Sequence, residues 1–174
     1  MKSILILFLI YSFSGTLLHY LFKISNYNIV VGMFSSVNES VWEHVKILLT
    51  PIFLVSFISF FITKDRNLFG LFIELLLGII LIVLFYEVKI ILFKDKYGFI
   101  NIIIFYITCL ILSIIHYLFS GIKINSFINS LSILPVVIIL SMYLTFSIFP
   151  PKNKYFKDPV TGSYGINRYV NKSV

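Results

Sequence analysis

Residues 40–62 read SVWEHVKILLTPIFLVSFISFFI, a mostly apolar run that is long enough to cross a bilayer as a helix. A transmembrane helix needs about 20 such residues. Four further stretches meet the same requirement, near 3–22, 68–88, 98–120 and 125–149. Because backbone N–H and C=O groups cannot go unpaired in lipid, each stretch should be helical. The sequence therefore predicts an all-α integral membrane bundle of five transmembrane helices.

Short polar segments separate these spans, and the chain turns polar after Pro150 and Pro151. We therefore expect a five-helix transmembrane domain over 1–149 and a polar C-terminal tail over 150–174. Proline removes a backbone donor and clashes with the preceding helical turn. Pro51 in the second span and Pro135 in the fifth should each kink their helix.

The composition agrees with a membrane protein. Hydrophobic residues make up 59% of the 174 residues and charged residues 12%, whereas soluble domains average about 45–50% and about 25%. Mean hydropathy is +1.02. The net charge of +7 indicates contact with anionic lipid headgroups rather than with nucleic acid. Membrane lipids are therefore the expected partners, and another membrane protein or a second copy of the chain stays open.

The basic residues predict an orientation. Of the 14 Lys and Arg residues, all but Lys2, Lys64, Arg66 and Lys123 fall on one face of the predicted bundle. Positive residues collect on the cytoplasmic side of membrane proteins. This predicts a plasma-membrane protein with its N-terminus outside and its C-terminus in the cytoplasm.

The same topology brings polar residues to one depth. The end of span one, the start of span two, the end of span three and the start of span four all meet the more basic face. One layer should therefore contain His19, Glu39, Glu43, His44, Glu87 and Asn101. His116 lies toward the opposite end of span four, nearer Glu74, so a zinc site built from all three histidines is not expected.

The segment SSVNESVWEH, residues 35–44, has two interpretations. Ser36-x-x-Glu39 and Ser40-x-x-Glu43 both match the capping box of a helix N-terminus, and Trp42 suits a membrane interface. This structural interpretation leaves His44 unexplained and does not need two carboxylates.

The functional interpretation is that His19, His44 and one of Glu39 or Glu43 converge. Two imidazoles and a carboxylate with an open position suit a metal that activates water, and the same groups without metal suit proton transfer. Zinc is the candidate cofactor. We expect Glu43 to be the carboxylate that joins His19 and His44, because it lies deeper in the predicted helix, and the ring nitrogens to lie roughly 3–4 Å apart.

The tail sequence is rich in turn formers, such as Asp158-Pro159 and Thr161-Gly162. Its lysines favour contact with anionic headgroups. The alternative is that the tail folds back over the layer that contains His19 and His44.

Three segments carry a resemblance to a known family: GTLLHYLF (15–22), NESVWEHVKILLTP (38–51) and FPPKNKYFKDPVTGSYGI (149–166). With them the chain resembles small bacterial and archaeal integral membrane proteins that share a domain of unknown function. The resemblance covers nearly the whole chain and implies no activity. It marks as motif members His19, Asn38, Glu39, Trp42, Glu43, His44, Asp158, Gly162 and Tyr164. It also implies an Asp at the start of span four, where this chain has Asn101.

A second likeness concerns NESVWEH alone. It is similar to the Asn-Glu-Thr…His helix start of the progestin-receptor-like and ceramidase-like membrane zinc hydrolases, which have more spans and a different Glu–His spacing. This likeness implies a zinc-dependent membrane hydrolase.

The expected function is a membrane protein whose His/Glu pocket acts on or binds a lipid-like substrate, with His19, Glu39, Glu43 and His44 as catalytic candidates. One alternative is a non-catalytic partner or assembly subunit that docks through Glu39, Trp42 and Glu43. Another is a transporter, for which five spans without an internal repeat are a poor match.

Overall fold

The computed structural model describes residues 2–62, 67–94 and 98–166. Their helices are α1 (Lys2–Ile24), α2 (Ile29–Phe34), α3 (Val41–Ile62), α4 (Leu68–Phe93), α5 (Phe99–Ser120), α6 (Ser126–Leu131) and α7 (Ile133–Ile148). The predicted all-α class is confirmed. Five segments are long and apolar enough to cross a membrane, the fifth being α6 and α7 taken together.

The long helices pack side by side around a core centred on α3 and α4. α1 contacts α3 and α5, α4 contacts α3 and α5, and α7 covers α4. The centre is filled by aliphatic side chains, among them Leu48, Leu49, Leu75 and Leu112, which are fully buried. Large apolar side chains cover the outside, and burying them in acyl chains is favourable. The chain is therefore a membrane protein, and the apolar outer faces of its long helices suit contact with lipid.

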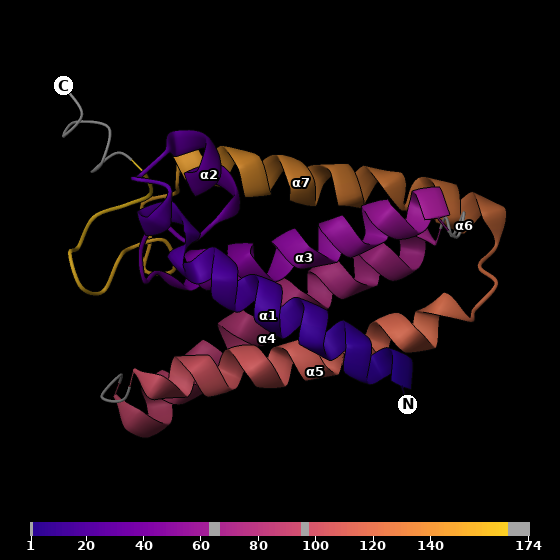
Figure 1. Ribbon diagram of the computed structural model, residues 1–174, viewed down its shortest axis with the longest axis horizontal. Coiled ribbons are helices and arrows are strands. Elements are labelled where there is room, and N and C mark those ends of the chain that lie inside the picture. Colours follow the sequence, from indigo (N-terminus) through magenta and orange to yellow (C-terminus); the bar gives the residue numbers. More distant parts are fainter. Residues whose placement is uncertain (1, 63–66, 95–97, 167–174) are drawn as a thin grey trace.

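The two ends of the bundle contain different segments of the chain. Figure 1 shows the N-terminus and α6 at one end, and α2 with the C-terminal segment at the other. We call the second of these the tail end. α2 was not expected from the sequence. Asn28 is its N-cap, and the Asn28 side chain accepts the N–H groups of Val30 and Val31. Such a cap offsets the low stability of so short a helix.

The two prolines have different outcomes. The fifth span is interrupted at Ser132, between α6 and α7, because Pro135 has no N–H and its ring opposes the carbonyl group of Leu131. α3 remains a single helix through Pro51, and the kink expected there stays a prediction. The carbonyl oxygen of Ile47, four residues earlier, faces Gly15 of α1, where a Cβ would lie 3.2 Å from it.

The tail folds back onto the bundle, which is the second of the two expected arrangements. The N–H of Trp42 donates to the carbonyl oxygen of Tyr155 over 3.0 Å, and the Trp42 ring stacks on Phe156 with centroids 5.0 Å apart. Lys154 Nζ lies 2.6 Å from Glu87 on α4. This hydrogen bond raises the pKa of Lys154 above its ordinary value.

Candidate functional site

Two histidines and one carboxylate converge at the tail end of the bundle. His19 comes from α1, Glu39 from the loop before α3, and His44 from the first turns of α3. One ligand atom from each lies within 4.8 Å of the other two. The Nε2 atom of His19 is 3.5 Å from Oε1 of Glu39, and the two imidazole centroids are 5.8 Å apart. We call these three residues the His–Glu–His group.

The imidazole of His44 is fixed by its own helix. Its Nδ1 atom lies 2.9 Å from the carbonyl oxygen of Ser40, one turn earlier. Because a carbonyl oxygen only accepts, Nδ1 must carry the proton of this hydrogen bond, and the neutral ring then keeps its lone pair on Nε2. A hydrogen bond to a backbone carbonyl is a usual support for a metal-binding histidine, since it fixes both tautomer and ring orientation.

Glu39 reaches the histidines because it is not part of the helix. α3 begins at Val41, and the residues before it form a turn. In this turn the Asn38 side chain accepts the N–H of Ser40, and the Ser36 hydroxyl donates to the Asn38 carbonyl oxygen. The Glu39 side chain is 43% exposed and faces His19.

Glu43 does not join the His–Glu–His group, which corrects the expected ligand set of His19, His44 and Glu43. Its carboxylate lies 2.8 Å from Lys46 Nζ in a fully buried ion pair and accepts the N–H of Val37 over 2.9 Å. Lys46 also donates to the carbonyl oxygen of Gly32. Glu43 is the deeper carboxylate, as expected, but its depth places it against this cation and away from the histidines.

The capping-box interpretation also needs correction. In that motif the carboxylate would accept the N–H of Ser40, whereas this N–H is taken by Asn38 and the Glu43 carboxylate reaches Val37. Glu43 on α3 thus holds the 35–40 loop, which contains Glu39, through the hydrogen bond that it accepts from the Val37 N–H.

A cavity of about 590 Å³ opens beside the His–Glu–His group, within the usual range for ligand pockets of about 300–1,000 Å³. Residues from four of the long helices line this cavity, including Lys89 of α4 and Asn101 of α5. The tail contributes Pro159 and Val160 to its wall. Apart from Glu43 and Glu87, which pair with lysines elsewhere, the residues of the expected polar layer meet in this cavity.

The remaining motif residues support the cavity wall and do not line it. Trp42 is buried under the tail. Asp158 closes the tail turn by accepting the Val160 N–H and the Thr161 hydroxyl, and Gly162 follows with a left-handed φ of 70°. Tyr164 pairs with Lys157 in an isolated antiparallel bridge. This turn holds Pro159 and Val160 against the cavity.

Several cavity residues were not expected from the sequence. Lys89 counted only as a loop charge, because the third span was expected to end at residue 88, whereas α4 runs to Phe93. Thr16 and Tyr106 bring hydroxyl groups from α1 and α5, 3.0 Å apart. The spacing of Thr16 and His19 on one face of a helix was the available indication for Thr16.

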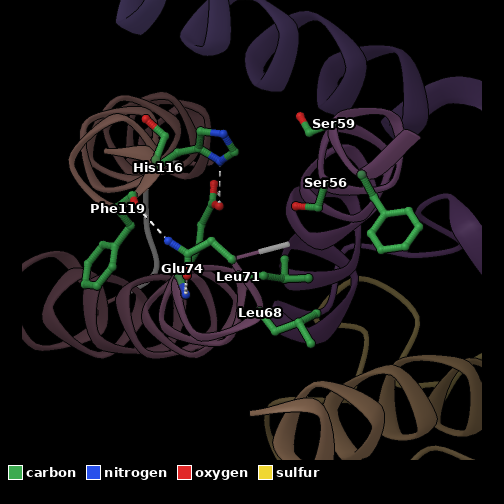
Figure 2. Close-up of a pocket in the computed structure, with 11 residues that line it drawn as sticks. Ser56, Ser59, Leu68, Leu71, Glu74, His116 and Phe119 are labelled. Atoms are coloured by element: carbon green, nitrogen blue, oxygen red, sulfur yellow. Dashed lines mark hydrogen bonds and ion pairs between the residues drawn. The ribbon is translucent and has the colours of Figure 1, made fainter. Parts of the chain in front are cut away.

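A second polar cluster lies at the opposite end of the bundle. His116 Nδ1 is 2.9 Å from Glu74 Oε2, which confirms the expected proximity, and the Tyr11 hydroxyl donates to the other carboxylate oxygen over 2.6 Å. Figure 2 shows this pair with Ser56 and Ser59 of α3 facing it across a small pocket. His116 is therefore separate from the His–Glu–His group, as its depth indicated.

Removing the imidazole of this cluster should destabilise the protein. His116→Ala leaves the Glu74 carboxylate, which is 1% exposed, with the Tyr11 hydroxyl but without its second partner. An unsatisfied buried polar group costs about 1–3 kcal/mol. Denaturant unfolding in detergent should show this loss, and His116→Asn, which keeps a donor near Nδ1, should recover part of it. Equal stability of wild type and His116→Ala would contradict the expectation.

The His–Glu–His group offers two imidazole nitrogens and one carboxylate oxygen on the wall of a cavity. Three such ligands with an open position are typical of catalytic zinc sites. Ligand atoms bound to one zinc ion at about 2.0–2.2 Å lie about 3.3–3.5 Å apart. The His19–Glu39 distance of 3.5 Å already matches this spacing, and the whole group falls within 4.8 Å.

Comparison with known proteins identifies a family and no activity. Residues 1–166 match the model of the family of unknown function DUF6512. The chain belongs to this family, as its resemblance to an uncharacterised membrane protein family predicted. No curated protein and no solved structure matches the chain.

Proposed function

We propose that this member of the DUF6512 family is a metal-dependent membrane hydrolase that cleaves an ester or amide bond in a lipid-like substrate. The observation that carries the proposal is the convergence of His19, Glu39 and His44 on one wall of a ligand-sized cavity. Zinc fits best, because imidazole and carboxylate are its usual ligands and it tolerates an open fourth position.

The position of the cavity supports a lipid-like substrate. Tyr20 of α1 and Ile102 of α5 line it, and both residues are exposed. They belong to two of the five helices that are long and apolar enough to cross a membrane. A substrate could therefore enter from the membrane with its hydrocarbon part against Ile102, Phe105 and Ile47, and place its polar part beside the His–Glu–His group.

The chemistry needs one water molecule and no further reactant. A zinc ion bound there would supply a water molecule activated for attack on an acyl carbon. The bond from this carbon to the leaving oxygen or nitrogen would break, and the leaving group would take up the proton released by the water. His19, Glu39 and His44 would hold the ion, and the Ser40 carbonyl would hold the His44 ring.

The alternative of a partner subunit has less support. Docking was expected to use Trp42 and Glu43 together with Glu39, yet Trp42 is 7% and Glu43 1% exposed.

We further propose that the protein is a multi-pass plasma-membrane protein with the tail end in the cytoplasm, on the basis of its basic residues.

Zinc binding by the purified protein in detergent tests the proposal. His19→Ala and His44→Ala should each weaken zinc affinity by more than about 100-fold. Loss of a residue that only supports a metal ligand already weakens affinity by up to about 100-fold, and loss of the ligand itself should cost more. Cobalt loading should give the visible spectrum of a tetrahedral site in wild type only. The same two variants, and treatment with a chelator, should abolish hydrolysis of 4-nitrophenyl laurate.

His116→Ala is the matched control, since it removes the third histidine outside the His–Glu–His group. It should keep zinc affinity and hydrolysis in the fraction that folds. Wild type that binds zinc no more tightly than His19→Ala would overturn the metal site. Zinc binding without hydrolysis of any acyl ester or amide would overturn the assignment as a hydrolase.

A further inference from the structure

We propose that the cavity selects a secondary amide over an ester, and that Tyr106 of α5 makes this selection by accepting a hydrogen bond from the amide N–H. This inference rests on the proposed function and narrows its substrate class to N-acyl amides that carry a hydrocarbon chain. The starting observation is a hydrogen bond between the hydroxyl groups of Thr16 and Tyr106, which are 3.0 Å apart. Both residues line the cavity beside the His–Glu–His group.

The direction of this hydrogen bond follows from a second one. Thr16 Oγ1 donates to the carbonyl oxygen of Ser12, one turn earlier on α1, over 2.8 Å, as a threonine inside a helix can do. A hydroxyl group has one hydrogen to donate, so Thr16 must accept the hydrogen bond that it shares with Tyr106. The Tyr106 oxygen, which gives its hydrogen to Thr16, can then only accept any further hydrogen bond.

The two hydroxyl groups adjoin the His–Glu–His group. Thr16 precedes His19 by three residues on α1, and side chains at this spacing are neighbours on one face of a helix, with Cβ atoms about 5–6 Å apart. α5 approaches α1 closely at this level, because Gly15 has no side chain and a Cβ there would overlap the ring of Phe105. This close approach brings Tyr106, the next residue of α5, within reach of Thr16.

An oxygen that can only accept distinguishes the two classes of acyl substrate. An ester and a secondary amide both contain a carbonyl oxygen, but only the amide has an N–H on the atom next to the acyl carbon. The linking oxygen of an ester is itself an acceptor, so it gains nothing from Tyr106. A neutral hydrogen bond is worth up to about 10-fold in affinity, and the cavity should therefore bind the amide more tightly by this order.

Binding of N-methyl lauramide and N,N-dimethyl lauramide to the zinc-loaded protein in nanodiscs tests the inference. The two probes share the acyl chain and the carbonyl group, and only the first has an N–H. Equilibrium uptake by empty nanodiscs of the same lipid is subtracted, so that partition into the bilayer does not count as binding. Wild type should bind N-methyl lauramide about 5–10-fold more tightly than the dimethyl probe, and Tyr106→Phe should bind the two probes equally.

Two variants of Thr16 test the direction of the hydrogen bond. Thr16→Val keeps the shape of the side chain and removes the acceptor of the Tyr106 hydrogen. The freed Tyr106 hydroxyl can then donate to the carbonyl oxygen of either probe, so the preference for the N–H should fall. Thr16→Ser keeps the hydroxyl group and should keep the preference.

Tyr117→Phe is the matched control, since it removes a tyrosine hydroxyl from the same helix at a residue that is not part of the cavity wall. It should show the preference of wild type. Zinc affinity and hydrolysis of 4-nitrophenyl laurate are measured on every sample, so that failure of the metal site is recognised separately. Equal binding of the two probes by wild type, with zinc binding intact, would overturn the inference and leave the proposed function standing. An unchanged preference in Tyr106→Phe would overturn the assignment to Tyr106.

Discussion

Lys46→Met is expected to lower the free energy of unfolding by about 3–5 kcal/mol, the usual cost of removing one partner from a buried ion pair. The variant leaves the Glu43 carboxylate buried with only the N–H of Val37. It also removes the hydrogen bond from Lys46 to the Gly32 carbonyl oxygen. Chemical unfolding in mild detergent, followed by circular dichroism, measures the effect.

Two comparisons make this expectation specific. The double variant Glu43→Gln/Lys46→Met removes both charges and should recover much of the loss, because the uncompensated charge causes most of the penalty. Lys154→Met breaks the Glu87 pair, in which the side chains are 62% and 30% exposed, and should cost less than about 1 kcal/mol. Equal losses in Lys46→Met and Lys154→Met would show that the buried pair does not hold the 35–40 loop.

Gly165→Ala should detach the tail from the bundle. Gly165 has a φ of 54°, and a Cβ there would lie 2.8 Å from Pro150 Cγ and 3.2 Å from the Ser147 carbonyl oxygen. The left-handed conformation costs a residue with a Cβ about 1–2 kcal/mol, and forcing an atom into packed surroundings costs about 1–3 kcal/mol more. Ile166, buried beside Phe22 and Val37, would leave its place with the tail.

The single tryptophan reports this change directly. Trp42 stacks on Phe156 of the tail, and the chain has one Trp, so its fluorescence should shift to longer wavelength when the tail separates. Gly162→Ala is the matched control, since Gly162 has a φ of 70° but the nearest atom to its Cβ position is 3.7 Å away. It should show only the backbone cost and no shift. Identical spectra for the two variants would show that Gly165 does not fasten the tail.

The spans and the depth of the site could be predicted because both depend on hydropathy and length. A run of apolar residues fixes a helix in lipid whatever its neighbours are, and the ends of successive helices then share a face. This is why His19, His44 and Asn101, far apart in sequence, were expected in one layer and line one cavity. It is also why His116 was expected elsewhere.

The choice between the two carboxylates could not be made from helical spacing. The sequence argument placed both carboxylates in the predicted span and chose Glu43 for its greater depth, whereas the helix begins only at Val41 and leaves Glu39 outside it. A residue in a turn points where the turn directs it, and here Asn38 sets that direction. The pairing of Glu43 with Lys46, three residues on, agrees with the side-chain spacing of a helix, but nothing in the spacing shows that the pair is buried.

The packing of the tail depends on contacts between residues far apart in sequence. Ile166 joins Phe22 and Val37 in a small buried cluster, and no local pattern around residue 166 indicates these partners. α2 was missed for a related reason. Six residues are too few to show a periodic hydrophobic pattern. α2 also contains Gly32, where Phe22 and Ile166 pack so closely that a Cβ would not fit.

The late place of the tail in the sequence has a consequence for biosynthesis. A ribosome makes Tyr155 and Pro159 only after all five spans, yet the start of α3 donates to Tyr155 and the cavity wall contains Pro159. Because membrane insertion proceeds span by span from the N-terminal side, the inserted nascent chain has its five helices before it has a closed cavity. The wall of this cavity is therefore completed only after translation has passed Pro159, later than the insertion of the helices that carry His19 and His44.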